Sequence, residues 1–151
     1  MPFAGTRIID THWSAHHAAV VPTAFNATVS IGYPTGTATY DPETDDTTQD
    51  YSTDWEGYAR IQALTGQRAV PTGGQILAGI PYLVQLPAAA PVVVRGARVK
   101  IVTALNDSEA VGDELWVVAA LIGSERFARD LLCSDNATDA PSVDAAPESV
   151  P

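Results

Sequence analysis

Six short stretches constrain the fold of this chain more than any other feature: four have an apolar period of two residues, one is apolar throughout, and 126–133 completes the set. In residues 28–33, for example, Val29, Ile31 and Tyr33 fall on one face. A period of two is that of a β-strand, and a run without polar positions is typical of a strand covered on both faces. The predicted strands are 28–33, 55–62, 80–86, 97–103, 115–122 and 126–133.

Turn residues separate these strands, and the chain has the size of one domain. Short strands divided by Gly, Pro and Asn-Asp signals favour a small barrel over a sandwich. With 151 residues, 46% of them hydrophobic, the chain closes one small core. We therefore expect a mainly β, single-domain β-barrel of about six strands, with a long acidic inter-strand loop and flexible terminal arms. A short helix over 124–132 stays open as an alternative to the last strand.

The acidic residues are concentrated in two stretches, and their placement says more than the net charge of −10. Seven acids and no base lie between Tyr33 and Arg60, and four acids and no base follow Ser134. The part from Arg60 to Ser134 has seven bases and six acids. A near-neutral body thus carries two acidic appendages, and a surface of this charge is not one that binds DNA or anionic lipid.

These patterns divide the chain into three parts. Residues 1–27 are expected to be an N-terminal arm with one helical turn. Residues 28–134 are the predicted barrel domain, interrupted by the loop 34–53, which is rich in Thr, Asp and Pro. Residues 135–151 are dominated by Ser, Ala, Pro and Asp, so they are expected to form a disordered acidic tail.

Motifs that resemble active or metal sites are incomplete in this chain. Residues 8–12 are similar to the strand end that opens metal-dependent amidohydrolases, but Ser14 stands where a second ligating His is required. His12 and His16 lack the HExxH glutamate between them, and 41–52 lacks the Gly and Glu of a calcium loop. We expect no catalytic residue, no cofactor, no metal and no enzymatic activity.

The single cysteine and the apolar runs bear on the compartment. Cys133 has no partner for an internal disulfide, and its apolar surroundings predict a buried thiol. The sequence shows neither a signal peptide nor a membrane-spanning stretch. We expect a soluble protein that is made in a cytoplasm and has no membrane partner.

A series of strands and turns carries a recognisable pattern. Its segments are 82–87 (YLVQLP), 95–99 (RGARV), 111–118 (VGDELWVV), 123–126 (GSER) and 129–133 (RDLLC). In their order and character these segments resemble the head-to-tail connector, or head-closure (stopper), proteins of tailed phages of the actinobacterial siphophage type. The resemblance covers residues 28–135 and departs at Ala97, where the family usually has Asp.

This resemblance implies a structural subunit of the virion that acts at the head-tail junction. Such a protein assembles in the host cytoplasm into a homo-oligomeric ring, six- or twelve-fold, which closes the DNA-filled capsid. The ring contacts the portal or adaptor ring on the head side and the tail terminator on the tail side. Double-stranded DNA passes through it without specific binding, and a long inter-strand loop projects into the DNA channel.

In this chain the counterpart of that loop is 34–53. Because DNA carries one negative charge per roughly 1.7 Å of axis, carboxylates in a channel repel it. A plain solvent-exposed loop is the alternative. The predicted channel or gating residues are Asp41, Glu43, Asp45, Asp46 and Asp50, and the predicted loop anchors are Trp55 and Tyr58.

Two other function classes stay open at this point. One is another neck component, a tail terminator or an adaptor. The other is a small virion-surface or carbohydrate-binding β-barrel, for which Trp13, Trp55 and Trp116 offer stacking platforms even though aromatic residues make up only 7% of the chain.

Overall fold

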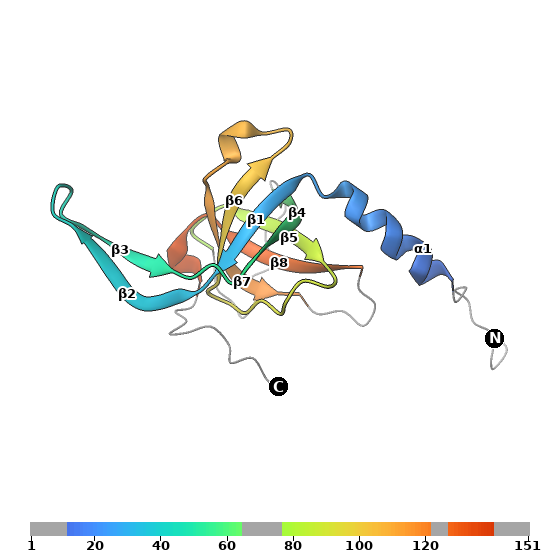
Figure 1. The fold of residues 1–151 in the computed structure, drawn as a ribbon, viewed down its shortest axis with the longest axis horizontal. Helices are drawn as coiled ribbons and strands as arrows, with labels where there is room; N and C mark the ends of the chain where they lie inside the picture. Colours follow the sequence, from blue (N-terminus) through green and yellow to red (C-terminus); the bar gives the residue numbers. More distant parts are fainter. Residues whose placement is uncertain (1–11, 65–76, 122–126, 141–151) are drawn as a thin grey trace.

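The structure, a computed structural model, describes residues 12–64, 77–121 and 127–140 and confirms the predicted β-barrel (Figure 1). Six antiparallel strands close on themselves in the order β1-β4-β5-β8-β7-β6. They are β1 (Ala27–Gly32), β4 (Trp55–Ala63), β5 (Pro81–Pro87), β6 (Arg98–Ala104), β7 (Glu114–Ala120) and β8 (Ala128–Ser134), and a short 3-10 turn, η2 (Ser108–Ala110), joins β6 to β7. The alternative helix over 124–132 is wrong, because β8 pairs with both β5 and β7.

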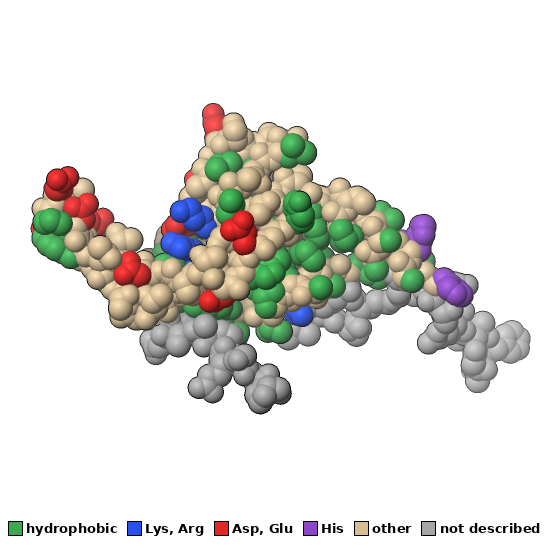
Figure 2. Space-filling view, in the orientation of Figure 1, with side chains coloured by type: hydrophobic (Ala, Val, Ile, Leu, Met, Phe, Trp, Pro, Cys, Tyr) green, Lys and Arg blue, Asp and Glu red, His purple; other side chains and the backbone are tan. Residues whose placement is uncertain are grey.

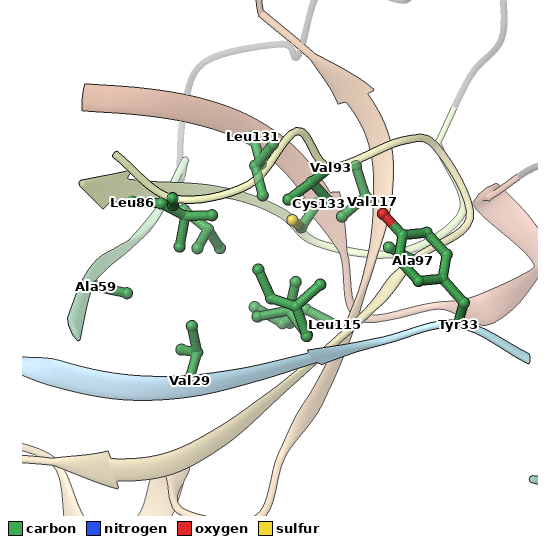
Figure 3. Packing of buried hydrophobic residues seen from close by; sticks show 14 residues of the cluster. Val29, Tyr33, Ala59, Leu86, Val93, Ala97, Leu115, Val117, Leu131 and Cys133 are labelled. Atoms are coloured by element: carbon green, nitrogen blue, oxygen red, sulfur yellow. The ribbon is translucent and has the colours of Figure 1, made fainter. Parts of the chain in front are cut away.

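The barrel core consists of the side chains that the two-residue period places inside. Val29 on β1 and Val84 and Leu86 on β5 are fully buried, and residues from the other strands converge on them (Figure 3). Burying a side chain of the size of Leu86 contributes about 1.5–3 kcal/mol. Cys133 lies in the same cluster, so the prediction of a buried thiol is confirmed, and burial raises the pKa of this thiol.

Residues 34–53, expected as a loop, instead contain a β-hairpin. β2 (Pro34–Asp41) pairs antiparallel with β3 (Asp46–Tyr51) in a two-stranded sheet separate from the barrel. The segment is rich in threonine, whose branched side chain favours strands, and Asp41-Pro42 starts the turn between them. Figure 1 shows the hairpin extending from one side of the barrel.

The N-terminal arm contains a helix longer than the single turn expected. α1 (Trp13–Val20) continues into a 3-10 turn, η1 (Val21–Ala24), which leads to β1. The rings of Trp13 and His17 lie 5.6 and 5.9 Å from the ring of Phe127, which precedes β8. These contacts hold α1 near the start of β8, and Figure 1 shows α1 leading away from the barrel opposite the hairpin. The rest of the predicted arm, residues 1–11, lies outside the described residues.

The acidic tail was predicted to begin at residue 135, but the ordered structure continues to residue 140. The turn η3 (Ala137–Asp139) follows β8, and the side chain of Asp139 is only 4% exposed. Its carboxylate accepts hydrogen bonds from the backbone N–H groups of Ala78 (2.7 Å) and Gly79 (2.8 Å) and from the hydroxyl of Ser134. Composition suggested disorder because it does not reveal that this acid has hydrogen-bond partners distant in sequence. Residues 141–151 lie outside the described residues.

Candidate functional site

The hairpin β2–β3 carries the predicted channel residues on a projection with little apolar surface. Asp41, Glu43, Asp45 and Asp46 lie at and around its tip and are exposed, whereas Asp50 is half-buried nearer the barrel. Figure 2 shows acidic side chains gathered toward the far end of the hairpin. The structure thus brings the five predicted acids together on one element.

Two of these acids shape the tip of the hairpin. The carboxylate of Asp41 accepts a hydrogen bond from the backbone N–H of Glu43 at 2.9 Å, which is an Asx turn. Asp45 has a positive φ of 55°, a conformation that Asp and Asn tolerate better than most residues. The hydroxyl of Tyr40 donates to the Asp45 carboxylate at 2.7 Å, and this hydrogen bond, with a smaller contribution from desolvation, raises the pKa of Tyr40.

Asp50 joins the two strands through side chains on one face of the hairpin. Its carboxylate accepts hydrogen bonds from the hydroxyls of Thr37 (3.1 Å) and Thr39 (3.0 Å) on the facing strand. Pairs of this kind contribute only a few tenths of a kcal/mol to about 1 kcal/mol. Because a lone two-stranded hairpin is at best marginally stable in water, the orientation of this one depends on how its base is held.

The base of the hairpin is held by an aromatic and charged cluster around Tyr51. The guanidinium of Arg98 lies 4.2 Å from the centroid of the Tyr51 ring, a cation–π arrangement. Arg98 also forms a 2.9 Å ion pair with Glu114, and the indole N–H of Trp116 donates to the Tyr51 hydroxyl at 3.4 Å. β6 and β7 therefore fix the end of β3 to the barrel wall.

A second set of contacts joins the start and the end of the hairpin. The backbone N–H of Ser52 donates to the carbonyl of Tyr33 at 2.8 Å, and the Ser52 hydroxyl accepts from the N–H of Tyr33 at 3.2 Å. Tyr33 is 5% exposed, and its hydroxyl accepts a hydrogen bond from the N–H of Val94 at 3.2 Å. Gly32 is required beside this junction, because a Cβ there would lie 1.7 Å from the Ser52 carbonyl oxygen.

The two predicted anchors of the hairpin do not share a location. Trp55 pairs with Ile31 just after the hairpin, and its half-buried ring packs against the core. Tyr58 pairs with Thr28 further along β4 and is 70% exposed. Residues three apart on a strand point to opposite faces, so Trp55 lies beside the hairpin on the core side, whereas the Tyr58 side chain points to solvent away from it. Tyr51, which sequence reasoning missed, lies at the base instead.

The histidines near α1 do not form part of a metal cluster in the described residues. Within 12–64, 77–121 and 127–140, no group of three or more His, Cys, Asp or Glu side chains is arranged to hold a metal ion. The rings of His16 and His17 lie 5.8 Å apart on α1. In the same described ranges, none of the helices has the length and apolar character needed to cross a bilayer.

Residues 17–134 match a family described as "Family of unknown function (DUF6093)". The chain belongs to this family. The match to the DUF6093 family begins within α1 and ends at the last residue of β8, so it includes the barrel and the acidic hairpin. No curated protein matches the chain.

The barrel of this DUF6093 member is similar to one of known structure, the solution structure of protein SF1141 from Shigella flexneri 2a. The two chains are 15% identical, the match covers 74% of this chain and 92% of the other, and the TM-score is 0.51. A likeness at this identity concerns the fold, so it supports the barrel architecture and carries no function.

Proposed function

We propose that the protein is a structural subunit of the phage head-tail junction, where copies form a ring that closes the DNA-filled capsid and offers the tail an attachment surface. In this proposal the hairpin β2–β3 lines or gates the DNA channel, and the protein has no catalytic role. The observation that carries the proposal is the acidic hairpin itself, which projects from a closed barrel and is fixed only at its base. The resemblance of residues 28–135 to connector proteins supports the same conclusion.

The length of the hairpin suits a channel lining. β2 has eight residues, which at about 3.3 Å per residue gives a projection of about 26 Å. A strand pair of this length reaches well beyond the barrel that carries it, whereas an ordinary two- to five-residue hairpin turn does not. The cluster around Tyr51 sets the direction in which the hairpin points.

The charge of the hairpin suits passage of DNA rather than capture. Each copy contributes the five acids from Asp41 to Asp50, so a sixfold ring presents about thirty carboxylates to its lumen. DNA held away from the wall slides without specific contacts. A basic lining would release counterions from DNA and bind it tightly in low salt.

A charge reversal on the hairpin tests this proposal. Glu43 and Asp46 are the best positions, because both are exposed and neither carboxylate contacts the facing strand. We expect assembled wild-type rings to retain no double-stranded DNA in a mobility assay. Rings of a Glu43→Lys/Asp46→Lys variant should retain DNA, with an affinity that falls steeply as salt increases.

Two controls make the result specific. A Glu43→Gln/Asp46→Asn variant removes the same acids without adding bases, and its rings should bind DNA weakly or not at all. A Glu56→Lys variant reverses an exposed charge on the barrel wall and should leave DNA retention unchanged. A reconstruction of the ring on its portal that places the hairpin on the outer wall would refute the channel role.

The alternative of a carbohydrate-binding barrel receives less support from the aromatic residues. Trp55 and Trp116 are half-buried and engaged with the core and with Tyr51, respectively, which leaves Trp13, 39% exposed, as the most accessible tryptophan. A glycan-array screen of the purified protein tests this alternative. A tail terminator or adaptor role is tested by which partner, portal or tail tube, the ring binds.

A further inference from the structure

We propose that a cavity at one end of the barrel binds residues 3–9 from the N-terminal arm of a second copy, so that neighbouring subunits join head to tail. This inference rests on the proposed ring and names the contact that builds it. The cavity has a volume of about 780 Å³ and opens where β1 begins and β6 ends. That volume is in the range of pockets that hold a drug-sized ligand.

The more buried part of the cavity lining includes apolar side chains. Ile61, Tyr82, Ile101 and Leu115 line the cavity from four different strands. At the mouth, Leu105 is 81% exposed, which is unusual for a large apolar side chain beside a hollow. Apolar side chains in the lining and an exposed leucine at the mouth fit a hydrophobic segment of another chain better than they fit water.

The rim of the cavity is acidic, and this feature selects the occupant. Glu114 is neutralised by Arg98, whereas no described Lys or Arg lines the cavity near the other acids. Burial raises the pKa of Tyr82 in the cavity lining, and the negative charges of Asp135 and Asp113 raise it further. An occupant with apolar side chains and a positive charge matches these surroundings. The other rim acids are Asp107, Glu109, Asp113 and Asp135.

Residues 3–9 of this chain have that chemistry. They contain Phe3, Ile8 and Ile9 as apolar side chains and Arg7 as a base, with no acid among them. The acidic hairpin and the acidic residues after Ser134 would be repelled by the same rim.

The helix that follows this segment is also placed for contact with another molecule. Most of α1 is exposed, including Val20 at 53% and Trp13 at 39%. An eight-residue helix is too short to be stable in water on its own, and its described ring contacts with the barrel are those of Trp13 and His17 with Phe127. A neighbour that bound the arm would cover this exposed apolar surface.

Geometry favours a second copy over the chain's own arm. Trp13 lies beside Phe127 at the start of β8, whereas the cavity wall includes Asp135, just past the end of β8. The strand between them has seven residues and spans about 23 Å. Four residues from Trp13 back to Ile9 reach at most about 14 Å, which is shorter than that strand, so the end of residues 3–9 nearest to α1 falls short of Asp135 in its own chain.

The described start of the arm, at Trp13, and the cavity wall at Asp135 therefore lie about one strand length apart, and a contact between the cavity and the arm of another copy is heterologous. Heterologous contacts form closed rings when the rotation between neighbours closes, and filaments when it does not. Each copy would give its arm to one neighbour and accept an arm from the other.

Mixing two defective full-length chains tests the proposal. The donor variant Arg7→Glu/Ile8→Ser/Ile9→Ser keeps an intact cavity, and the acceptor variant Glu109→Lys/Asp113→Lys keeps an intact arm. By sedimentation velocity we expect the wild type to self-associate and each variant alone to do so at least about tenfold more weakly. Mixed together, the two variants should form a one-to-one dimer that grows no further, because they share one intact interface.

Controls separate this contact from general charge effects. The variant Glu43→Lys/Glu56→Lys makes the same charge change outside the cavity and should associate like the wild type. A chain with Ile9→Cys and Ala110→Cys should form disulfides between copies; disulfides formed within single copies would overturn the proposal. A wild type that stays monomeric, or variants that associate as it does, would also overturn it. If each variant still formed rings on the portal, the proposed contact between arm and cavity would be refuted, whereas the proposed function would not.

Discussion

Replacing Asp139 by Asn is expected to destabilise the barrel, although the residue lies beyond the last strand. The carboxylate accepts three hydrogen bonds, two of them from backbone N–H groups of a segment about sixty residues earlier. Hydrogen bonds to a charged acceptor contribute roughly 1.5–3 kcal/mol each, and the amide of Asn turns one acceptor into a donor that faces an N–H group. Ala78 is exposed, so water replaces part of the loss. We expect the free energy of unfolding to fall by about 2–4 kcal/mol.

The effect of this substitution has a defined pH dependence. Burial raises the pKa of Asp139, but hydrogen bonds from Ala78, Ser134 and Gly79 lower it, and the net result lies below the ordinary value of 3.8. A pKa that is lower in the folded state stabilises the fold fully above the unfolded-state pKa of about 3.9. That stability is lost as the pH falls through the folded-state pKa. The difference between wild type and variant should be constant near neutral pH and shrink below about pH 4.

Thermal unfolding followed by tryptophan fluorescence measures this difference. A loss of 2–4 kcal/mol corresponds to a decrease in Tm of roughly 6–12 °C for a chain of this size. A chain that ends at Ala140 keeps Asp139 and serves as the control, whereas a chain that ends at Asp135 should lose as much stability as the Asn variant. A variant whose Tm lies within about 1 °C of wild type at neutral pH would refute the reasoning.

Three further substitutions or reagents test other parts of the structure. Gly32→Ala should lower the free energy of unfolding by about 3 kcal/mol or more, because its Cβ would overlap the Ser52 carbonyl. Gly36→Ala lies in open space with φ +78°, so it should lower that free energy by only about 1 kcal/mol through backbone strain. Chemical denaturation of the two variants measures the difference. Tyr51→Phe should lower the free energy of unfolding by about 1 kcal/mol, because it removes the hydrogen bond from Trp116. Tyr51→Leu also removes the ring beside Arg98, so it should in addition speed amide hydrogen exchange throughout β2 and β3. The Cys133 thiol should react with a disulfide reagent only as fast as the protein unfolds, since burial raises its pKa; fast labelling of the folded protein would contradict this.

Four of the six barrel strands were predictable because burial of alternate residues gives their sequences an apolar period of two, and β7 was predictable from its continuous apolar run. Val29 and Ile31 point inward and their neighbours point outward, as the pattern indicates. The hairpin escaped prediction because its alternation is between polar residues, with Thr and Asp on one face and no buried side. The threonine content and the Asp41-Pro42 turn were the available signals.

The contacts at the base of the hairpin and at the end of the chain depend on residues distant in sequence. Trp116 reaches Tyr51 across 65 positions, and Asp139 reaches Ala78 across 61. Contacts between residues so far apart in sequence cannot be predicted from a local hydrophobic period or from composition. The grouping of five acids was visible in the sequence, but the side chains that orient them were visible only once the barrel had placed β6 and β7 beside β3.

Barrel closure has a consequence for how copies of this protein meet one another. A closed barrel has no edge strand, so within the described ranges the free backbone edges belong to β2 and β3. Exposed edge strands are sites where β-proteins aggregate, and natural proteins protect such edges with charged side chains. If the hairpins of two copies paired edge to edge, their carboxylates would lie side by side. Repulsion between the carboxylates of two hairpins therefore disfavours edge-to-edge pairing of β2 and β3 between copies.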